Sequence, residues 1–141
     1  MKQAKWLVVV TLVVLSGMAA AQRIGSSRIV AQVPFEFMVA NKIVPAGEYT
    51  VQAFTMDGNT LVIRNPEAKV GLVSPSSQSE GKQEASHYAL VFKHYGDRYF
   101  LSGIKLEGSN ITYRLPESKV EAELRAQSVS ATEESLRASL K

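Results

Sequence analysis

The chain has 141 residues and no cysteine, with 16 basic against 13 acidic residues and a formal net charge of +3. The absence of cysteine excludes disulfides, thiol nucleophiles and thiolate metal sites. Lys2 and Lys5 lie in the expected targeting segment, and the rest of the chain has 14 basic against 13 acidic residues. A nucleic-acid-binding protein concentrates basic residues on one face, so we expect no nucleic-acid partner.

The first 21 residues have the order of a secretory signal peptide. Lys2 and Lys5 precede the apolar run Trp6–Leu15, and small residues follow up to Ala21. A charged head, an apolar middle and a small-residue cleavage site direct export, whereas a membrane-spanning helix needs about 20 apolar residues. We therefore expect an exported, periplasmic or extracellular protein with no stable membrane span after cleavage. Residues 22–30 are expected to form a flexible lead-in.

Alternation of apolar and polar residues dominates the β-domain that we expect from residue 31 to residue 126. Val33, Phe35 and Phe37 point one way, and such a period of two indicates a strand with one buried face. The pattern recurs between turn signals such as Gly96-Asp97, giving about seven strands at 8–12-residue spacing. This spacing predicts an all-β fold, either a small antiparallel β-sandwich or a partly closed barrel. The polar interval 75–86 is expected to be a mobile surface loop.

The period changes near the C-terminus, which predicts a helix there. Ser118 and Glu121 have the spacing of a capping box, in which the serine accepts from a backbone N–H and the glutamate reaches back. Val120 and Leu124 are four apart, on one helical face, and are expected to bury against the open core. Residues 127–141 are expected to form a partly helical or loosely ordered tail.

Several segments resemble a group of small secreted bacterial β-proteins of acidobacterial type and unknown function. They are Pro34–Phe37, Pro45–Val51 and Leu90–Leu101, together with Leu115–Ser118, which is similar to the usual ending of the group. The likeness covers about Val33–Ala126. The resemblance implies a bacterial envelope or extracellular setting, and it implies no catalytic residue.

Residue patterns favour neither a catalytic site nor a metal site. His87 and His94 are seven apart, which places them on opposite faces of a straight strand. His94, Asp97 and Ser102 include the residue types of a catalytic triad, but no Gly-x-Ser-x-Gly motif accompanies them. We therefore expect no enzyme activity, no metal and no cofactor.

A group of cations and tyrosines on outward strand positions is the candidate binding site. It comprises Lys93, Tyr95, Tyr99, Lys105 and Arg114. Tyrosine offers an apolar ring with a polar tip, and cations would favour anionic envelope polymers, although a solvated sheet face carries the same residue types.

The favoured function is a non-enzymatic exported binding or interaction module of the bacterial envelope. It would act by surface recognition of an envelope polymer or protein. Two alternatives stay open. One is a lipocalin-like carrier that encloses a small apolar ligand in its barrel, and the other is a secreted hydrolase.

Overall fold

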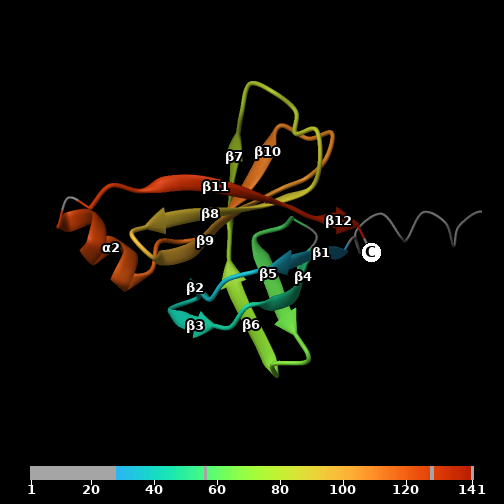
Figure 1. Cartoon of the computed structure of the whole chain (residues 1–141). Coiled ribbons are helices and arrows are strands. Elements are labelled where there is room, and N and C mark those ends of the chain that lie inside the picture. Colours follow the sequence, from blue (N-terminus) through green and yellow to red (C-terminus); the bar gives the residue numbers. More distant parts are fainter. Residues whose placement is uncertain (1–27, 56, 128, 141) are drawn as a thin grey trace, which may run out of the picture.

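The structure is a computed structural model that describes residues 28–55, 57–127 and 129–140. These residues form twelve strands and one helix, α2 (Lys119–Ala126), shown in chain order in Figure 1. The strands are β1 (Arg28–Val33), β2 (Phe37–Val39), β3 (Lys42–Val44), β4 (Gly47–Ala53), β5 (Thr60–Asn65), β6 (Val70–Pro75), β7 (Ser77–Glu80), β8 (Ala89–Tyr95), β9 (Arg98–Lys105), β10 (Ile111–Arg114), β11 (Thr132–Arg137) and β12 (Ser139–Leu140). The expected signal peptide, residues 1–21, lies outside the described residues.

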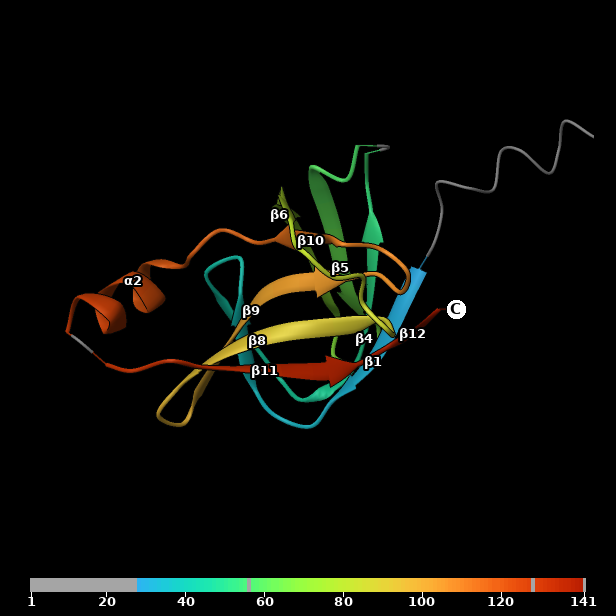
Figure 2. The same ribbon diagram turned by 90° about the horizontal axis from the view of Figure 1, so that it is seen from above.

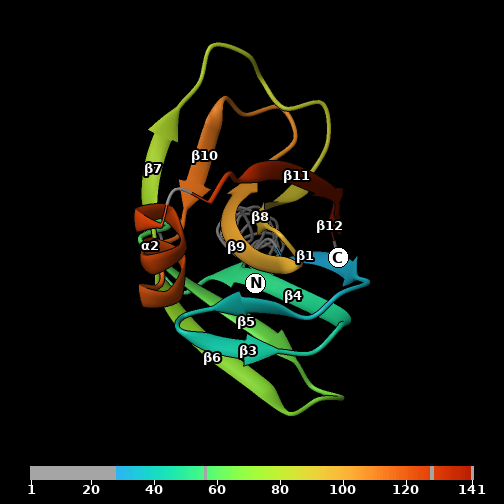
Figure 3. The same cartoon turned by 60° about the vertical axis from the view of Figure 1, so that its left-hand side comes forward.

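Two sheets build the domain. Sheet A has the order β12-β1-β4-β5-β6, and the main path of sheet B has the order β11-β8-β9-β10-β7. The β2–β3 hairpin joins sheet B through one parallel pair, Met38 with Phe100. Figure 3 shows β4, β5 and β6 on one side of the molecule, with β8, β9 and β11 on the other. The predicted all-β sandwich is confirmed, and the described strands do not close into a barrel.

The chain crosses between the sheets at both of their long edges. Only Ser76 separates β6 of sheet A from β7 of sheet B, and only Ala138 separates β11 of sheet B from β12 of sheet A. Figure 2 shows β11 continuing into β12 beside β1. These one-residue connections keep the neighbouring edges of the two sheets close together.

Aromatic and branched side chains fill the space between the sheets. Val33, Tyr49 and Ile63 come from sheet A, and Phe92 comes from sheet B. The ring of Phe37 lies 4.9 Å from that of Tyr49 and 5.3 Å from that of Phe92, both in edge-to-face contact. Successive strand residues point to opposite faces, and the predicted inward positions Val33, Tyr49 and Phe92 are buried. Phe35 and Tyr113, which were also predicted to point inward, are half-buried.

Tyr49 anchors the turn that leads into β4. Its side chain is fully buried, and its hydroxyl donates a hydrogen bond to the carbonyl of Pro45 at 2.5 Å. Burial raises the pKa of Tyr49 above its ordinary value of 10.0, and a hydrogen bond with Asn65 offsets part of this rise. The folded protein therefore keeps the neutral phenol at a pH at which the unfolded chain begins to lose the proton.

This difference in pKa predicts a loss of stability in alkali. The contribution of Tyr49 is complete below pH 10.0, the unfolded value, and is lost as the pH rises through the raised folded pKa. Above pH 10, the free energy of unfolding of Tyr49→Phe is expected to fall less steeply with pH than that of the wild type. Below pH 9 it should show a constant loss of about 1 kcal/mol from the missing hydrogen bond. Urea unfolding across pH 8–11 measures both, and equal alkaline slopes in the two proteins would contradict the assignment.

Three sequence-based expectations for the first half of the chain need correction. The strand expected around Val33 and Phe37 is interrupted at Pro34, which lacks the N–H needed for a ladder hydrogen bond. The expected lead-in overlaps β1, because β1 begins at Arg28 and Ile29 is buried. The described residues contain twelve strands rather than about seven, since breaks and polar strands divide the chain further.

The tail expected to be partly helical forms strands instead. β11 pairs with β8 over six residues, and β12 pairs with β1 through Leu140 and Ser139. Leu136 packs against the core while most of β11 is exposed. The backbone edge of β8 offers a ladder of hydrogen bonds over six residues, and this pairing overrides local helical propensity.

The predicted helix α2 is confirmed, and Ser118 Oγ accepts a hydrogen bond from the backbone N–H of Glu121 at 3.1 Å. Val120 and Leu124 are half-buried and lie outside the core cluster between the sheets. This corrects the expectation that they bury against an open core, because α2 contacts the outer face of sheet B instead. No helix of residues 28–140, as far as they are described, is long and apolar enough to cross a membrane.

Candidate functional site

A groove of about 710 Å³ lies on the outer face of sheet B, the face directed away from sheet A. Its floor consists of short side chains on four neighbouring strands. They are Ala89 and Val91 of β8, Gly103 of β9, Thr112 of β10 and Ser135 of β11. Register places Val91 beside both Gly103 and Ser135. Short side chains at aligned positions leave the hollow that larger residues would fill.

A β-bulge curves the sheet beneath the groove. The register between β8 and β9 shifts at Val91/Phe92, and Ser102 Oγ donates to the carbonyl of Val91 at 3.1 Å. A bulge bends its strand and strengthens the local twist. A Cβ added at Gly103 would lie 3.2 Å from Thr112 Cγ2 and 3.3 Å from the carbonyl oxygen of Tyr113. Glycine therefore permits the close approach of β10 that completes the floor.

The segment between β7 and β8, residues 81–88, arches along one side of the groove and is tied to the turn between β9 and β10. Gly81 N donates to Asn110 O at 2.8 Å, Ala85 N donates to Ser109 O at 2.9 Å, and Gly108 N donates to Ala85 O at 2.9 Å. Figure 1 shows this arch above β10. The expected mobile loop at 75–86 is therefore a strand, β7, followed by a tethered arch.

Two predicted site residues, Lys105 and Arg114, line this groove together. Lys105 lies opposite Thr112 and Arg114 lies opposite Gly103, so both cations are on the same face of adjacent strands. Lys105 is half-buried and Arg114 is exposed. Neither forms a salt bridge with any residue that the structure describes.

Lys93 and Tyr95 lie farther along β8, where both contact α2, although the Lys93 side chain stays 36% exposed. Tyr95 is buried, and its hydroxyl donates to Glu121 Oε2 at 3.1 Å, while Lys93 Nζ lies 3.8 Å from the same oxygen. Burial raises the pKa of Tyr95, and the negative charge of Glu121 raises it further. This pair holds the helix on the sheet, so Tyr95 does not offer an exposed ring to a ligand.

Tyr99 lies on the core side of sheet B, between two other rings. Its ring stacks on that of Phe35 at 3.7 Å and on that of His94 at 4.0 Å. Both faces are therefore covered, and neither is free to stack on a sugar. Tyr99 borders a separate, smaller hollow of about 230 Å³ beside Phe35 and Ile43. The five predicted site residues thus divide among three places, and only Lys105 and Arg114 share the groove.

The residue types considered for catalysis are not assembled into a reactive set. Ser102 donates to a backbone carbonyl, and His94 Nδ1 faces Glu134 Oε1 at 3.6 Å. His87 lines the groove, where its Nδ1 lies 3.0 Å from Ser86 Oγ. Within the described ranges, no group of three or more His, Asp or Glu side chains could hold a metal ion.

Sequence reasoning missed Glu133, which lines the groove from β11. The segment that carries it was expected to be helical or loosely ordered, so no position on a sheet face could be assigned to it. It also missed His87 and the small residues of the floor. Alternation indicates that Ala89 and Val91 point away from the core, but it does not show that an arch from residues 81–88 encloses them.

Comparisons of the chain with models of known protein families, with curated proteins and with solved structures found no match. The geometry of the groove is therefore the guide to function.

Proposed function

We propose that the protein is a non-enzymatic binding module of the bacterial envelope, exported from the cytoplasm, that recognises its partner in the groove of sheet B. The observation that carries this proposal is a hollow of about 710 Å³ in which Lys105 and Arg114 have no ion-pair partner among the described residues. Ligand pockets commonly have volumes of roughly 300–1,000 Å³ and present a few convergent polar groups.

The rigidity of the groove walls supports recognition. Four paired strands form the floor, and three backbone hydrogen bonds tether the arch. A preformed site loses less conformational entropy on binding than a mobile loop does. The proposed site therefore needs no large rearrangement to receive a ligand.

The contents of the core favour surface recognition over carriage of an apolar ligand. The rings of Phe37, Tyr49 and Phe92 meet in the middle of the space between the sheets, where a lipocalin-like protein would hold its ligand. The separate environments of Ser102 and His94 give the hydrolase alternative no assembled nucleophile and base. Export rests on the signal-peptide pattern of residues 1–21.

The proposal predicts that neutralising the two groove cations weakens attachment to the envelope. In sedimentation of the protein with a bacterial cell-envelope fraction, Lys105→Gln/Arg114→Gln is expected to lower affinity by about tenfold or more. Charge-assisted hydrogen bonds are worth about 1.5–3 kcal/mol each, and every 1.4 kcal/mol is about tenfold in affinity.

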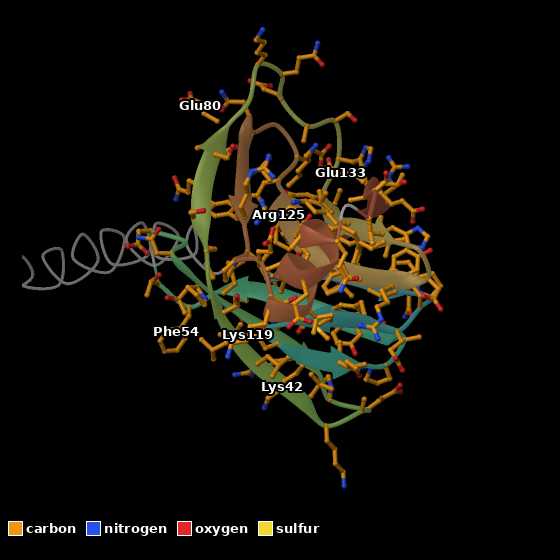
Figure 4. All side chains as sticks on the ribbon, turned by 90° about the vertical axis from the view of Figure 1, so that its left-hand side faces the viewer. Lys42, Phe54, Glu80, Lys119, Arg125 and Glu133 are labelled. Atoms are coloured by element: carbon orange, nitrogen blue, oxygen red, sulfur yellow. The ribbon has the colours of Figure 1, made fainter. Side chains whose placement is uncertain are left out.

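The matched control is Lys42→Gln/Arg64→Gln, which removes the same charge from exposed positions on β3 and β5. Figure 4 shows Lys42 at the opposite end of the molecule from the arch. The control should bind like the wild type. Equal weakening by both double variants would indicate a general effect of net charge and would rule out recognition in the groove.

A further inference from the structure

The groove carries charges of both signs. Lys105 and Arg114 project from β9 and β10, and Glu133 lies on the opposite wall, on β11. Figure 4 shows Glu133 and Glu80 toward opposite edges of the sheet, since Glu80 belongs to the edge strand β7. The neutral floor lies between these cations and Glu133, which faces Lys93 across the β11–β8 ladder. Glu80 lies beyond the cations, on β7.

The charges around the groove balance, which disfavours a simple polyanion. Three cations and three carboxylates line it, namely Lys82, Lys105, Arg114, Glu80, Glu84 and Glu133. Glu80 Oε1 already accepts a hydrogen bond from Asn110 Nδ2 at 3.4 Å. A ligand of one sign would be attracted by some of these groups and repelled by others, whereas a dipolar ligand can place each end against a group of opposite sign.

The strand order sets the separation of the opposite charges. Glu133 on β11 and Arg114 on β10 are three strand spacings apart, or about 14 Å on a flat sheet. Register aligns Arg114 with Gly103, Val91 and Ser135, two residues from Glu133. This offset brings the Cα separation to about 16 Å, and an extended tetrapeptide spans about 14 Å. The inward reach of the two side chains covers the difference.

The floor can satisfy the polar backbone of such a ligand. Thr112 and Ser135 present hydroxyl groups in the groove, and Ser79 adds a third from β7. Hydroxyls donate and accept hydrogen bonds, which suits amide N–H and C=O groups. The short floor side chains leave room for a chain with small side groups.

We propose that the groove binds a short zwitterionic peptide with free ends, about four residues long, and this inference rests on the proposed binding function. Its carboxylate pairs with Arg114 and Lys105, and its ammonium pairs with Glu133. The hydroxyls of the floor contact its backbone.

Calorimetric titration of the full protein at low ionic strength tests this assignment with three peptides. The probes are tetra-alanine with free ends, its N-acetyl form and its C-terminal amide. Each blocked peptide is expected to bind about tenfold more weakly than the free one, because each has lost one charge-assisted contact. These arms use only the wild-type protein, so they do not depend on the folding of a variant.

Variants then assign each end of the peptide. Arg114→Gln should bind free tetra-alanine more weakly and discriminate less between it and the amide. Glu133→Gln should discriminate less between the free and acetylated peptides. Glu67→Gln, an exposed change between β5 and β6, should behave like the wild type in all three titrations.

Equal affinity for the three peptides, absence of binding at millimolar concentration, or tighter binding of tetra-glutamate than of tetra-alanine would overturn the assignment. Envelope binding that depends on Lys105 and Arg114, with no binding of free tetra-alanine, would refute the peptide and leave the groove function standing. Envelope binding that is indifferent to both cations would refute the groove function itself.

Discussion

Replacement of Phe92 by alanine is expected to lower the free energy of unfolding by about 3–5 kcal/mol. Phe92 has no exposed surface, and its ring makes edge-to-face contacts with those of Phe35 at 5.0 Å and Phe37 at 5.3 Å. The loss combines the lost burial of the ring with the cost of the cavity left between the sheets. Phe37 is held by its pairing with Val44 and by its contact with the Tyr49 ring, so it cannot move far enough to fill that cavity.

Urea unfolding followed by far-ultraviolet circular dichroism measures this loss of unfolding free energy. Phe54→Ala is the matched control, because the Phe54 side chain is 72% exposed and exposed substitutions usually change stability by less than about 0.5 kcal/mol. If Phe92→Ala does not fold, Phe92→Leu keeps part of the apolar volume and should show a smaller loss. An unchanged unfolding midpoint in Phe92→Ala would mean that the ring is not at the centre of the core.

The sandwich could be predicted from the sequence wherever burial of one face left a period of two. Leu90 and Phe92 alternate with outward residues, and both are buried as expected. Gly96, with a φ of 61°, closes the β8–β9 turn where the Gly-Asp pair predicted a reversal. Left-handed backbone favours glycine, so local turn chemistry and strand patterning indicate the same hairpin.

Strands with little buried apolar surface could not be predicted in this way. β7 consists of Ser77–Glu80, all four residues being polar, and it exists because β10 offers a backbone partner. In β11, Leu136 is the only half-buried residue. A spacing of four, as between Leu136 and Leu140, puts two residues on the same face in either a helix or a strand. The sequence pattern therefore could not decide between them.

The same limit applies to the candidate site. Alternation was enough to place Lys105 and Arg114 on a common face. It placed Tyr99 outward as well, which is wrong, because the register shift between β8 and β9 reverses the faces of β9 and puts Tyr99 on the core side. It could not show that α2 covers Tyr95, because that contact joins residues 26 positions apart. Pattern reasoning assigns a residue to a face, whereas the accessibility of that face depends on which distant segment packs against it.

The buried carboxylate of Glu121 explains why that contact forms. The predicted capping box leads one to expect this side chain to bond back to the helix start, but it turns towards β8 instead. There it accepts from the Tyr95 hydroxyl and lies 3.8 Å from Lys93 Nζ, with only 5% of its side chain exposed. Ser118 Oγ and Asn41 Oδ1 accept from backbone N–H groups of the first turn, which leaves the Glu121 carboxylate free to dock α2 on the sheet.

Glu121→Ala is therefore expected to lower the free energy of unfolding by about 2 kcal/mol, because the buried Tyr95 hydroxyl loses its acceptor. Glu121→Gln keeps an acceptor and should lose less. Glu123→Ala is the control, since it removes the same charge from an exposed position on α2. Urea unfolding of the three variants gives the order of the losses.

Titration of tyrosine absorbance provides a readout that a general loss of stability would not reproduce. The charge of Glu121 contributes to the raised pKa of Tyr95, so Glu121→Gln should bring that pKa down while burial keeps it above the ordinary value. Glu123→Ala should leave the titration curve unchanged. If Glu121→Gln and the wild type titrate alike, the carboxylate does not face Tyr95, and α2 must be held on sheet B by contacts of its half-buried apolar residues, Val120 and Leu124.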